Sequence, residues 1–361
     1  MTDLIKTELR HNTGIITLDR PAALNSLNLD MVRAMTAALL TWRDDPNIAA
    51  VLVRGSSERA FCAGGDIRFF HQKGSTTATG GAALIEDFFT EEYTLNHLVH
   101  TYPKPYIALM DGVVMGGGMG IAQAGPQARL RIVTERTKMA MPETGIGFFP
   151  DVGGGWFLSR APGQLGTYLG VTGEVIGAAD ALYAGLADLF VPGTALSSLS
   201  EAIIEGKNAQ ISAHEFASQF VSQADPAQSW LAQHRVAIDR HFAFDSISAI
   251  IASLSADNSE FASVTLATMG KRSPLMMSVV LSQLRRARHL EIADCLRMER
   301  TMVRRSFENG EVIEGVRALA IDKDHAPKWK PSTLEEVTPQ MVDKFFESAW
   351  PDYAHPLRDF L

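Results

Sequence analysis

The sequence is poor in cysteine, in positive charge and in long apolar runs, and each shortage argues against a class of protein. Two cysteines, Cys62 and Cys295, show no CxxC spacing, so we expect no disulfide framework and a reducing compartment. A formal net charge of -8 disfavours a general electrostatic grip on nucleic acid. No run of about 18 apolar residues could span a membrane, and the N-terminal MTDLIKTELRHN lacks the apolar stretch of a secretory leader. These shortages predict a cytoplasmic protein without nucleic-acid or membrane partners.

The 361 residues are 46% hydrophobic and 20% charged, enough for one large domain with an extension or for two domains. Strand-like and helix-like segments alternate in the first half, which predicts an α/β layered domain. A helix is expected over 29–43, with Asn28 as its N-cap. Strands are expected at 13–19, 48–53, 106–110 and 130–133. From about Gly206 helical periodicity dominates, so we predict a catalytic part at 1–205 and a mostly helical part at 206–361.

Several common catalytic and phosphate-binding motifs are missing. The sequence has no P-loop, no GxGxxG with the right spacing after a strand, and no GxSxG elbow. His97 and His100 lie three residues apart, but no HExxH or Cys/His cluster accompanies them. We therefore expect no metal site.

Glycine is concentrated instead of spread evenly. Ten of the 29 glycines fall within 112–120 and 145–155, and glycine is favoured where backbone approaches a ligand or adopts a positive φ. AFCAGGDIR, at 60–68, combines a glycine turn with Asp66, which can cap a following helix. MGGGM, at 115–119, is expected to lie between a strand and a helix, where unpaired N–H groups and the helix dipole could stabilise an oxyanion. Alone, each could be only a tight turn or a close packing contact.

A third segment, MPETGIGFFPDVGGG at 141–155, carries acids in otherwise apolar surroundings. Burial there would perturb the pKa of Glu143 and Asp151 and suit them to acid, base or nucleophilic work. The alternative makes Asp151 a helix N-cap and Glu143 a solvated loop residue.

Taken together, AFCAGGDIR, MGGGMG and MPETGIGFFPDVGGGWFLSR resemble the crotonase superfamily over roughly the first 200 residues. This resemblance implies a spiral of ββα units with an α-helical C-terminal region. It also implies that the N–H groups of Gly65 and Gly117 form an oxyanion hole for a thioester carbonyl. Cys62 would then be a small loop residue and not a nucleophile.

Two positions distinguish branches of the superfamily. Enoyl-CoA hydratases usually carry two glutamates, and the first of these positions is Gly120 here, whereas the second is retained as Glu143. Asp151 stands where hydratases have glycine. The PDVGGG run resembles the 3-hydroxyisobutyryl-CoA hydrolase branch. So do three other segments: EEY (91–93), SP (273–274) and EGVRALAIDKDHAPKW (314–329).

That branch implies hydrolysis of a short 3-hydroxyacyl-CoA in valine breakdown. Glu143 would either attack the thioester to form a mixed anhydride or activate water as a base, and Asp151 would position water or shuttle a proton. Glu92, Asp66 and Ile67 would contact the substrate. CoA is part of that substrate, so no separate cofactor is implied, and a homo-oligomer is possible.

Two alternatives stay open from sequence. One is a hydratase or isomerase of the same superfamily, against which Gly120 counts. The other is a non-catalytic acyl-CoA-binding or RNA-binding relative, against which the acidic charge and the acids Glu143 and Asp151 count.

Overall fold

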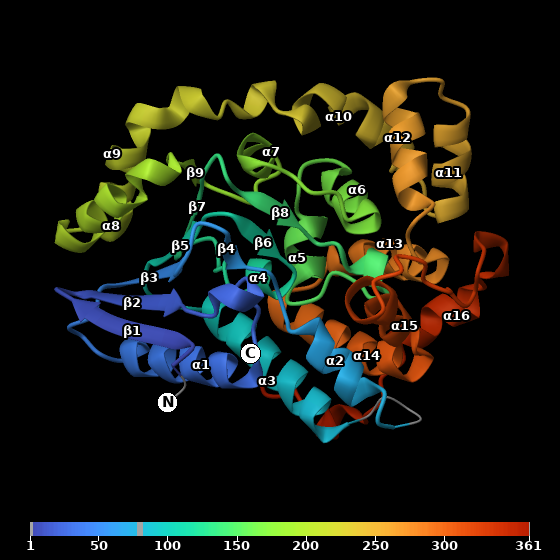
Figure 1. The fold of residues 1–361 in the computed structure, drawn as a ribbon, viewed down its shortest axis with the longest axis horizontal. Coiled ribbons are helices and arrows are strands. Elements are labelled where there is room, and N and C mark those ends of the chain that lie inside the picture. The colour runs from blue at the N-terminus through green and yellow to red at the C-terminus, as the bar shows by residue number, and fades with distance from the viewer. Residues whose placement is uncertain (1–2, 78–81, 361) are drawn as a thin grey trace. The chain divides into compact units, whose positions relative to one another are not determined.

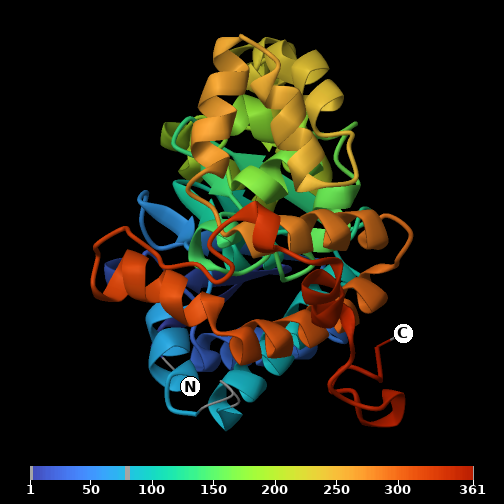
Figure 2. The same ribbon diagram turned by 90° about the vertical axis from the view of Figure 1, so that its right-hand side faces the viewer.

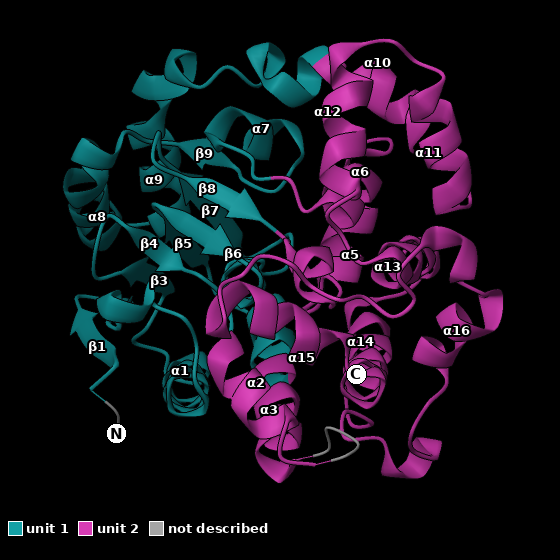
Figure 3. Ribbon diagram, turned by 45° about the vertical axis from the view of Figure 1, so that its right-hand side comes forward, with its two compact units in different colours: residues 1–65, 94–140, 175–233 teal, residues 66–93, 141–174, 234–361 magenta. Residues whose placement is uncertain are grey.

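The computed structural model describes residues 3–77 and 82–360, which form two compact units (Figure 3). Unit 1 comprises residues 1–65, 94–140 and 175–233; unit 2 comprises residues 66–93, 141–174 and 234–361. Both units draw residues from the predicted catalytic part and the predicted helical part, whose division at residue 205 stays a prediction. Met1 and Thr2, which begin the segment examined for a leader, lie outside the described residues.

Unit 1 is built around a six-stranded sheet in the order β1-β2-β3-β5-β7-β9 (Figure 1). β1 and β2 pair antiparallel, and the neighbours that follow are parallel. Every residue of the central β5 is buried, as expected for a parallel strand covered on both faces. The strands are β1 (Ile5–Arg10), β2 (Thr13–Leu18), β3 (Ala50–Gly55), β5 (Tyr106–Met110), β7 (Arg129–Val133) and β9 (Leu189–Phe190).

A second sheet of three short parallel strands lies in the same unit: β4 (Ala60–Cys62), β6 (Val113–Met115) and β8 (Lys138–Ala140). Successive strand pairs, β3 with β4, β5 with β6 and β7 with β8, each give one strand to each sheet. This alternation confirms the predicted spiral of ββα units.

The helix predicted over 29–43 forms in unit 1. Asn28 caps α1 (Leu29–Arg43) by accepting a hydrogen bond from Met31 N at 2.9 Å. A core of Ile, Leu and Val from the large sheet packs with residues of α8 (Leu196–Glu205) and α9 (Ala209–Ala217). Shorter helices are α4 (Gly117–Gly120), α7 (Ala178–Tyr183) and the 3₁₀ turns Pro21–Ala23, Gly193–Ala195, Ser218–Gln223 and Pro226–Gln228.

Two local predictions in unit 1 were wrong. Cys62 is not a loop residue but ends β4, where it is fully buried. The triple glycine is followed by only one helical turn, α4, and is preceded by β6, which was not predicted. Three-residue strands are too short to show a period, and one turn of helix sums few peptide dipoles.

The described part of unit 2 contains helices and loops without a strand (Figure 2). Residues 206–360 likewise contain helices and loops without a strand, which confirms the predicted helical C-terminal region. Its α-helices are α2 (Ile67–Gly74), α5 (Gly154–Ser159), α6 (Leu165–Thr172), α11 (Ile247–Ser255), α12 (Glu260–Met269), α13 (Pro274–Ala287), α14 (Ile292–Asn309), α15 (Glu311–Val316) and α16 (Pro339–Asp343). A π-helix spans Arg317–Ile321, and 3₁₀ turns span Glu143–Ile146, Leu334–Glu336, Lys344–Phe346 and Asp352–Ala354. α3 (Ala83–His100) and α10 (Trp230–His241) have residues in both units. Within the described ranges, no helix combines the length and apolar character needed to cross a membrane.

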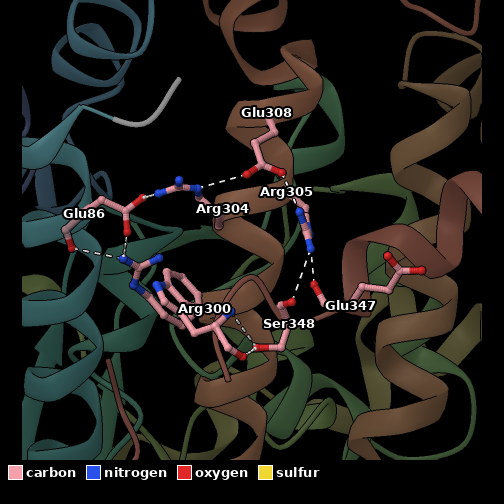
Figure 4. A network of polar contacts seen from close by, with 8 residues as sticks. Glu86, Arg300, Arg304, Arg305, Glu308, Glu347 and Ser348 are labelled. Carbon is pink, nitrogen blue, oxygen red and sulfur yellow. Dashed lines mark hydrogen bonds and ion pairs between the residues drawn. The ribbon is translucent and has the colours of Figure 1, made fainter. Parts of the chain in front are cut away.

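An arginine network on α14 fastens α3 and the C-terminal segment within unit 2 (Figure 4). Arg300 is fully buried and pairs with the Glu86 carboxylate on α3, and Arg304 reaches the same carboxylate at 2.8 Å. Arg305 donates to the backbone carbonyl of Glu347 at 2.9 Å. Because charged groups buried this deeply need partners, the network fixes the first half of α3 on α14.

Candidate functional site

The first two glycine segments lie side by side in unit 1. β4, which precedes the first, pairs in parallel with β6, which precedes the second. Gly64 has φ +94°, and a Cβ there would lie 3.0 Å from Met115 O and 3.3 Å from Gly117 N. Gly118 approaches so closely that its Cβ would lie 2.2 Å from Cys62 O. The structure therefore brings the loops of Gly65 and Gly117 together, and only glycine allows the approach.

Gly117 is the first residue of α4, so its N–H belongs to the donors that a helix leaves without an intrahelical partner. Gly65 follows the left-handed Gly64 and forms an isolated parallel bridge with Leu27. The arrangement is compatible with two backbone donors for a carbonyl oxygen, although their role as an oxyanion hole stays a prediction.

Five carboxyl groups are buried in the described part of unit 2, and one of them, Glu311, accepts a hydrogen bond from Ser273 Oγ. The other four characterise the candidate site. They come from four different segments, and their side chains are at most 6% exposed: Glu92 on α3, Glu143 in the 3₁₀ turn, Asp151 in the loop before α5, and Glu299 on α14. The solvated-loop interpretation of Glu143 was therefore wrong. The N-cap interpretation of Asp151 was also wrong, because Gly153 occupies the N-cap position of α5.

Tyr93 connects α3 to this group. Its hydroxyl, fully buried, donates a hydrogen bond to Asp151 Oδ2 at 2.8 Å. In contrast, Glu92 Oε1 and Glu143 Oε2 are buried without a hydrogen-bond partner in the described structure. An unpaired buried carboxyl is costly when ionised, so these two groups favour the protonated form until a ligand pairs with them.

Burial is the main cause of altered acidity in all four groups. Burial, followed by the negative charge of Asp151, holds the pKa of both Glu92 and Glu143 well above the ordinary value. Burial raises the pKa of Asp151 to about 7, although the Tyr93 hydroxyl opposes this rise. Burial raises the pKa of Glu299 to about 8, opposed by the N–H groups of Gly153 and Gly155. Like charges this close disfavour joint ionisation, so the group retains protons near neutral pH.

This arrangement can supply both a base and an acid. Tyr93 favours the ionised form of Asp151, whereas Glu92 Oε1 and Glu143 Oε2 have no hydrogen-bond partner in the described structure. Neighbouring carboxyls with different environments are typical of sites in which one group accepts a proton while another donates it.

The two adjacent glutamates on α3 differ in exposure. Glu92 points inward and is 2% exposed, whereas Glu91 is half-buried. Asp66 and Ile67 begin α2: Asp66 is half-buried and accepts a hydrogen bond from Phe69 N at 3.3 Å. The predicted capping by Asp66 is confirmed, while the substrate contacts of Asp66, Ile67 and Glu92 stay predictions.

Sequence reasoning missed Glu299 and the hydrogen bond of Tyr93. A signal for Glu299 was available, because it shares a helical face with the buried Cys295 and Met302 on α14. An acid at an apolar position of an amphipathic helix is unusual. The partner loop lies nearly 150 residues earlier in the sequence, so no local pattern connects them.

Comparisons with known proteins place these features in a family. Residues 13–346 match the family model described as enoyl-CoA hydratase/isomerase. The mitochondrial 3-hydroxyisobutyryl-CoA hydrolase of Danio rerio is 40% identical over 339 residues, which cover 93% of this chain and 87% of that protein. The human protein of the same name is 38% identical over 342 residues, covering 93% and 86%.

Solved structures resemble the fold over nearly the whole chain. A carnitinyl-CoA dehydratase from Mycobacterium thermoresistibile has a TM-score of 0.88 and 37% identity, covering 97% of this chain and 98% of that one. An enoyl-CoA hydratase from Rhodobacter sphaeroides has a TM-score of 0.85 and 36% identity, covering 96% and 98%. The motifs, the fold and these matches agree: the chain belongs to the enoyl-CoA hydratase/isomerase family, the crotonase superfamily.

Proposed function

We propose that this protein is an acyl-CoA thioester hydrolase that converts 3-hydroxyisobutyryl-CoA to 3-hydroxyisobutyrate and CoA. Relatives at 38–40% identity over most of the chain carry that activity in their names. The observation that carries the proposal is the buried pair Glu143 and Asp151, with Tyr93 bonded to Asp151. The pathway would be valine breakdown, and CoA would enter as part of the substrate.

A hydratase or dehydratase is the competing function, because the two similar solved structures have those titles. Gly120 is the residue against it. It ends α4 and is buried, so the position where hydratases usually carry their first glutamate has no side chain to act on a double bond. Asp151 adds an acid that the hydratase pattern lacks. A purely binding relative is disfavoured because the two buried acids with an unpartnered oxygen, Glu92 and Glu143, would be costly to retain without chemistry.

The proposed roles require Glu143 to ionise when substrate binds, because burial raises its pKa in the ligand-free site. The N–H groups of Gly65 and Gly117 stabilise the negative charge that develops on the thioester oxygen. Glu143 either attacks the carbonyl carbon, releasing CoA thiolate and leaving a mixed anhydride for water to cleave, or removes a proton from the attacking water. Asp151 positions that water and shuttles its proton. Both routes use the retained acids and need no separate cofactor.

We expect purified protein to release free thiol from 3-hydroxyisobutyryl-CoA without added metal and to hydrate crotonyl-CoA poorly. A panel of short acyl-CoA substrates, followed by thiol detection and by loss of the enoyl absorbance, measures both reactions. Efficient hydration of crotonyl-CoA without thiol release from any panel member would refute the hydrolase.

Glu143→Gln and Asp151→Asn should each lower kcat by roughly a hundredfold or more, as expected for groups that act in the transition state. Both substitutions keep the side-chain shape, so melting should be preserved. Asp245→Asn is the matched control, because Asp245 is 95% exposed at its side chain. Wild-type kcat in a folded Glu143→Gln protein would remove Glu143 from the mechanism.

Tyr93→Phe tests the acidity of Asp151. The Tyr93 hydroxyl lowers the pKa of Asp151 against the effect of burial, so its loss should raise that pKa. If the carboxylate is the active form, kcat rises with pH through this pKa, near 7 in the wild type. The rising limb in Tyr93→Phe should then move upward by roughly one pH unit, the effect of one hydrogen bond to a charged group. An unmoved or lowered limb would contradict the assignment.

Glu92→Ala tests selectivity for the acyl hydroxyl. A buried carboxyl without a partner suits a substrate hydroxyl that can donate to it, and sites of this kind reject analogues lacking the hydroxyl. kcat/KM should fall by about tenfold or more for 3-hydroxyisobutyryl-CoA and by less for isobutyryl-CoA. Glu91→Ala, on a neighbouring but half-buried position, is the control. Equal losses on both substrates would mean a general role, and no loss would mean that Glu92 does not contact the acyl group.

We also propose a cytoplasmic location and a possible homo-oligomer for this protein. The curated relatives, in contrast, are named as mitochondrial proteins. Cell fractionation and the mass in solution would test each.

A further inference from the structure

The turn that carries Asp151 is strained and needs external support. Val152 has φ +53° and Gly153 has φ +87°, so two successive residues are left-handed. For a β-branched residue such as Val152 this conformation is an outlier, and outliers persist only where the surroundings impose them. Within the turn, Gly154 N donates to Asp151 O at 2.6 Å. One backbone hydrogen bond closes the turn, and the neighbouring N–H groups point elsewhere.

Those neighbouring N–H groups meet the carboxylate of Glu299. Gly153 N donates to Glu299 Oε2 at 2.7 Å, and Gly155 N donates to Glu299 Oε1 at 2.8 Å. A Cβ at residue 155 would lie 2.9 Å from that Oε1, so glycine is needed for this approach. A carboxylate held by two N–H groups of one turn resembles an anion-binding nest, here filled by the protein's own side chain.

Gln283 on α13 adds hydrogen bonds to the segment before Asp151 and to Glu299. Its Nε2 donates to Pro150 O at 2.7 Å and to Glu299 Oε1 at 3.3 Å. Gln283 and Glu299 are both fully buried. The residues on either side of Asp151 are therefore held from α13 and α14, at Pro150 by Gln283 and at two glycines by Glu299.

We infer that Glu299, with Gln283, is a positioning residue that holds the Asp151 turn in its reactive conformation. This inference rests on the proposed hydrolase function of Asp151. Glu299 acts through the backbone and does not need to touch substrate. It also accounts for two glycines of PDVGGG, because Gly153 adopts a positive φ and a Cβ at Gly155 would lie 2.9 Å from Glu299 Oε1.

Few titratable groups face Glu299, so its influence can be isolated. The negative charge of Asp151 raises the pKa of Glu299. The negative charge of Glu299 in turn raises the pKa of Tyr93 on α3 and of Cys295, one turn earlier on α14. Gln283 is its uncharged neighbour on α13. None of these groups is a Lys or Arg that would pair with Glu299, so its hydrogen bonds to the turn are the feature that a substitution removes.

Glu299→Gln is the direct test. Its amide has the same shape, but one of its ends is an NH₂ donor that cannot accept from Gly153 or Gly155. We expect kcat to fall by roughly 10- to 100-fold, the range in which misplacement of a catalytic group acts, with KM changed much less. Glu291→Gln is the matched control, because Glu291 is an exposed acid at the start of the same helix and should leave kcat unchanged.

A double-variant cycle separates positioning from a merely structural role. If Glu299 acts through Asp151, Glu299→Gln should cause little further loss of kcat when Asp151→Asn is already present. Additive losses, or a folded Glu299→Gln protein with wild-type kcat, would overturn the inference. If Glu299→Gln does not fold, Gln283→Met decides. It removes the hydrogen bonds to Pro150 O and to Glu299 Oε1 but leaves those from Gly153 and Gly155 to Glu299, and an unchanged kcat in that variant would overturn the inference.

Wild-type protein in the same assay keeps the two hypotheses apart. Absence of thiol release by the wild type would refute the proposed function. Normal release by the wild type, with unchanged kcat in Glu299→Gln, would refute only the positioning role.

Discussion

Burial of four carboxyl groups within unit 2 is the constraint around which the site is organised. Glu92, Glu143, Asp151 and Glu299 are nearly inaccessible, and burial is the largest cause of the raised pKa in each. An acid whose pKa is higher in the folded chain than in the unfolded chain costs stability once it ionises. The folded chain binds more protons than the unfolded chain, so stability is greatest below the ordinary pKa and falls as pH rises toward 7 and 8. A fold that keeps this cost is consistent with selection for chemistry at these groups.

The contrast between paired and unpaired acids on the same elements shows that the missing partners are a specific property of the site. Glu86 and Glu92 both lie on α3, yet Glu86 receives Arg300 and Arg304 whereas Glu92 has an oxygen without any hydrogen-bond partner. On α14 the neighbouring residues Glu299 and Arg300 have different partners. Glu299 bonds to the Asp151 turn, and Arg300 bonds to Glu86. The arginine network can fix α3 and α14 without neutralising the buried acids of the site, because Arg300 and Arg304 pair with Glu86.

Local signals explain which parts could be predicted from sequence. The helix capped by Asn28 and the strands of the large sheet follow from periodicity and capping over short windows, whereas Glu92 was selected by family resemblance. The resemblance of three motifs added the superfamily and the acids Glu143 and Asp151 to what could be predicted. The three-residue strands β4, β6 and β8 show no period, and Glu299 reaches a loop nearly 150 residues away. Such features depend on tertiary packing, which no local window contains.

The central claim is that Glu92 and Glu143 hold protons at neutral pH in the ligand-free protein, and infrared spectroscopy in D₂O tests it most directly. A protonated carboxyl absorbs apart from a carboxylate, so the two forms can be followed during a pH titration of the folded protein. We predict a protonated carboxyl band that persists at pH 7, declines as pH rises further, and is weakened in Glu92→Gln and in Glu143→Gln. A folded protein whose carboxyls are all ionised by pH 6 would contradict the account.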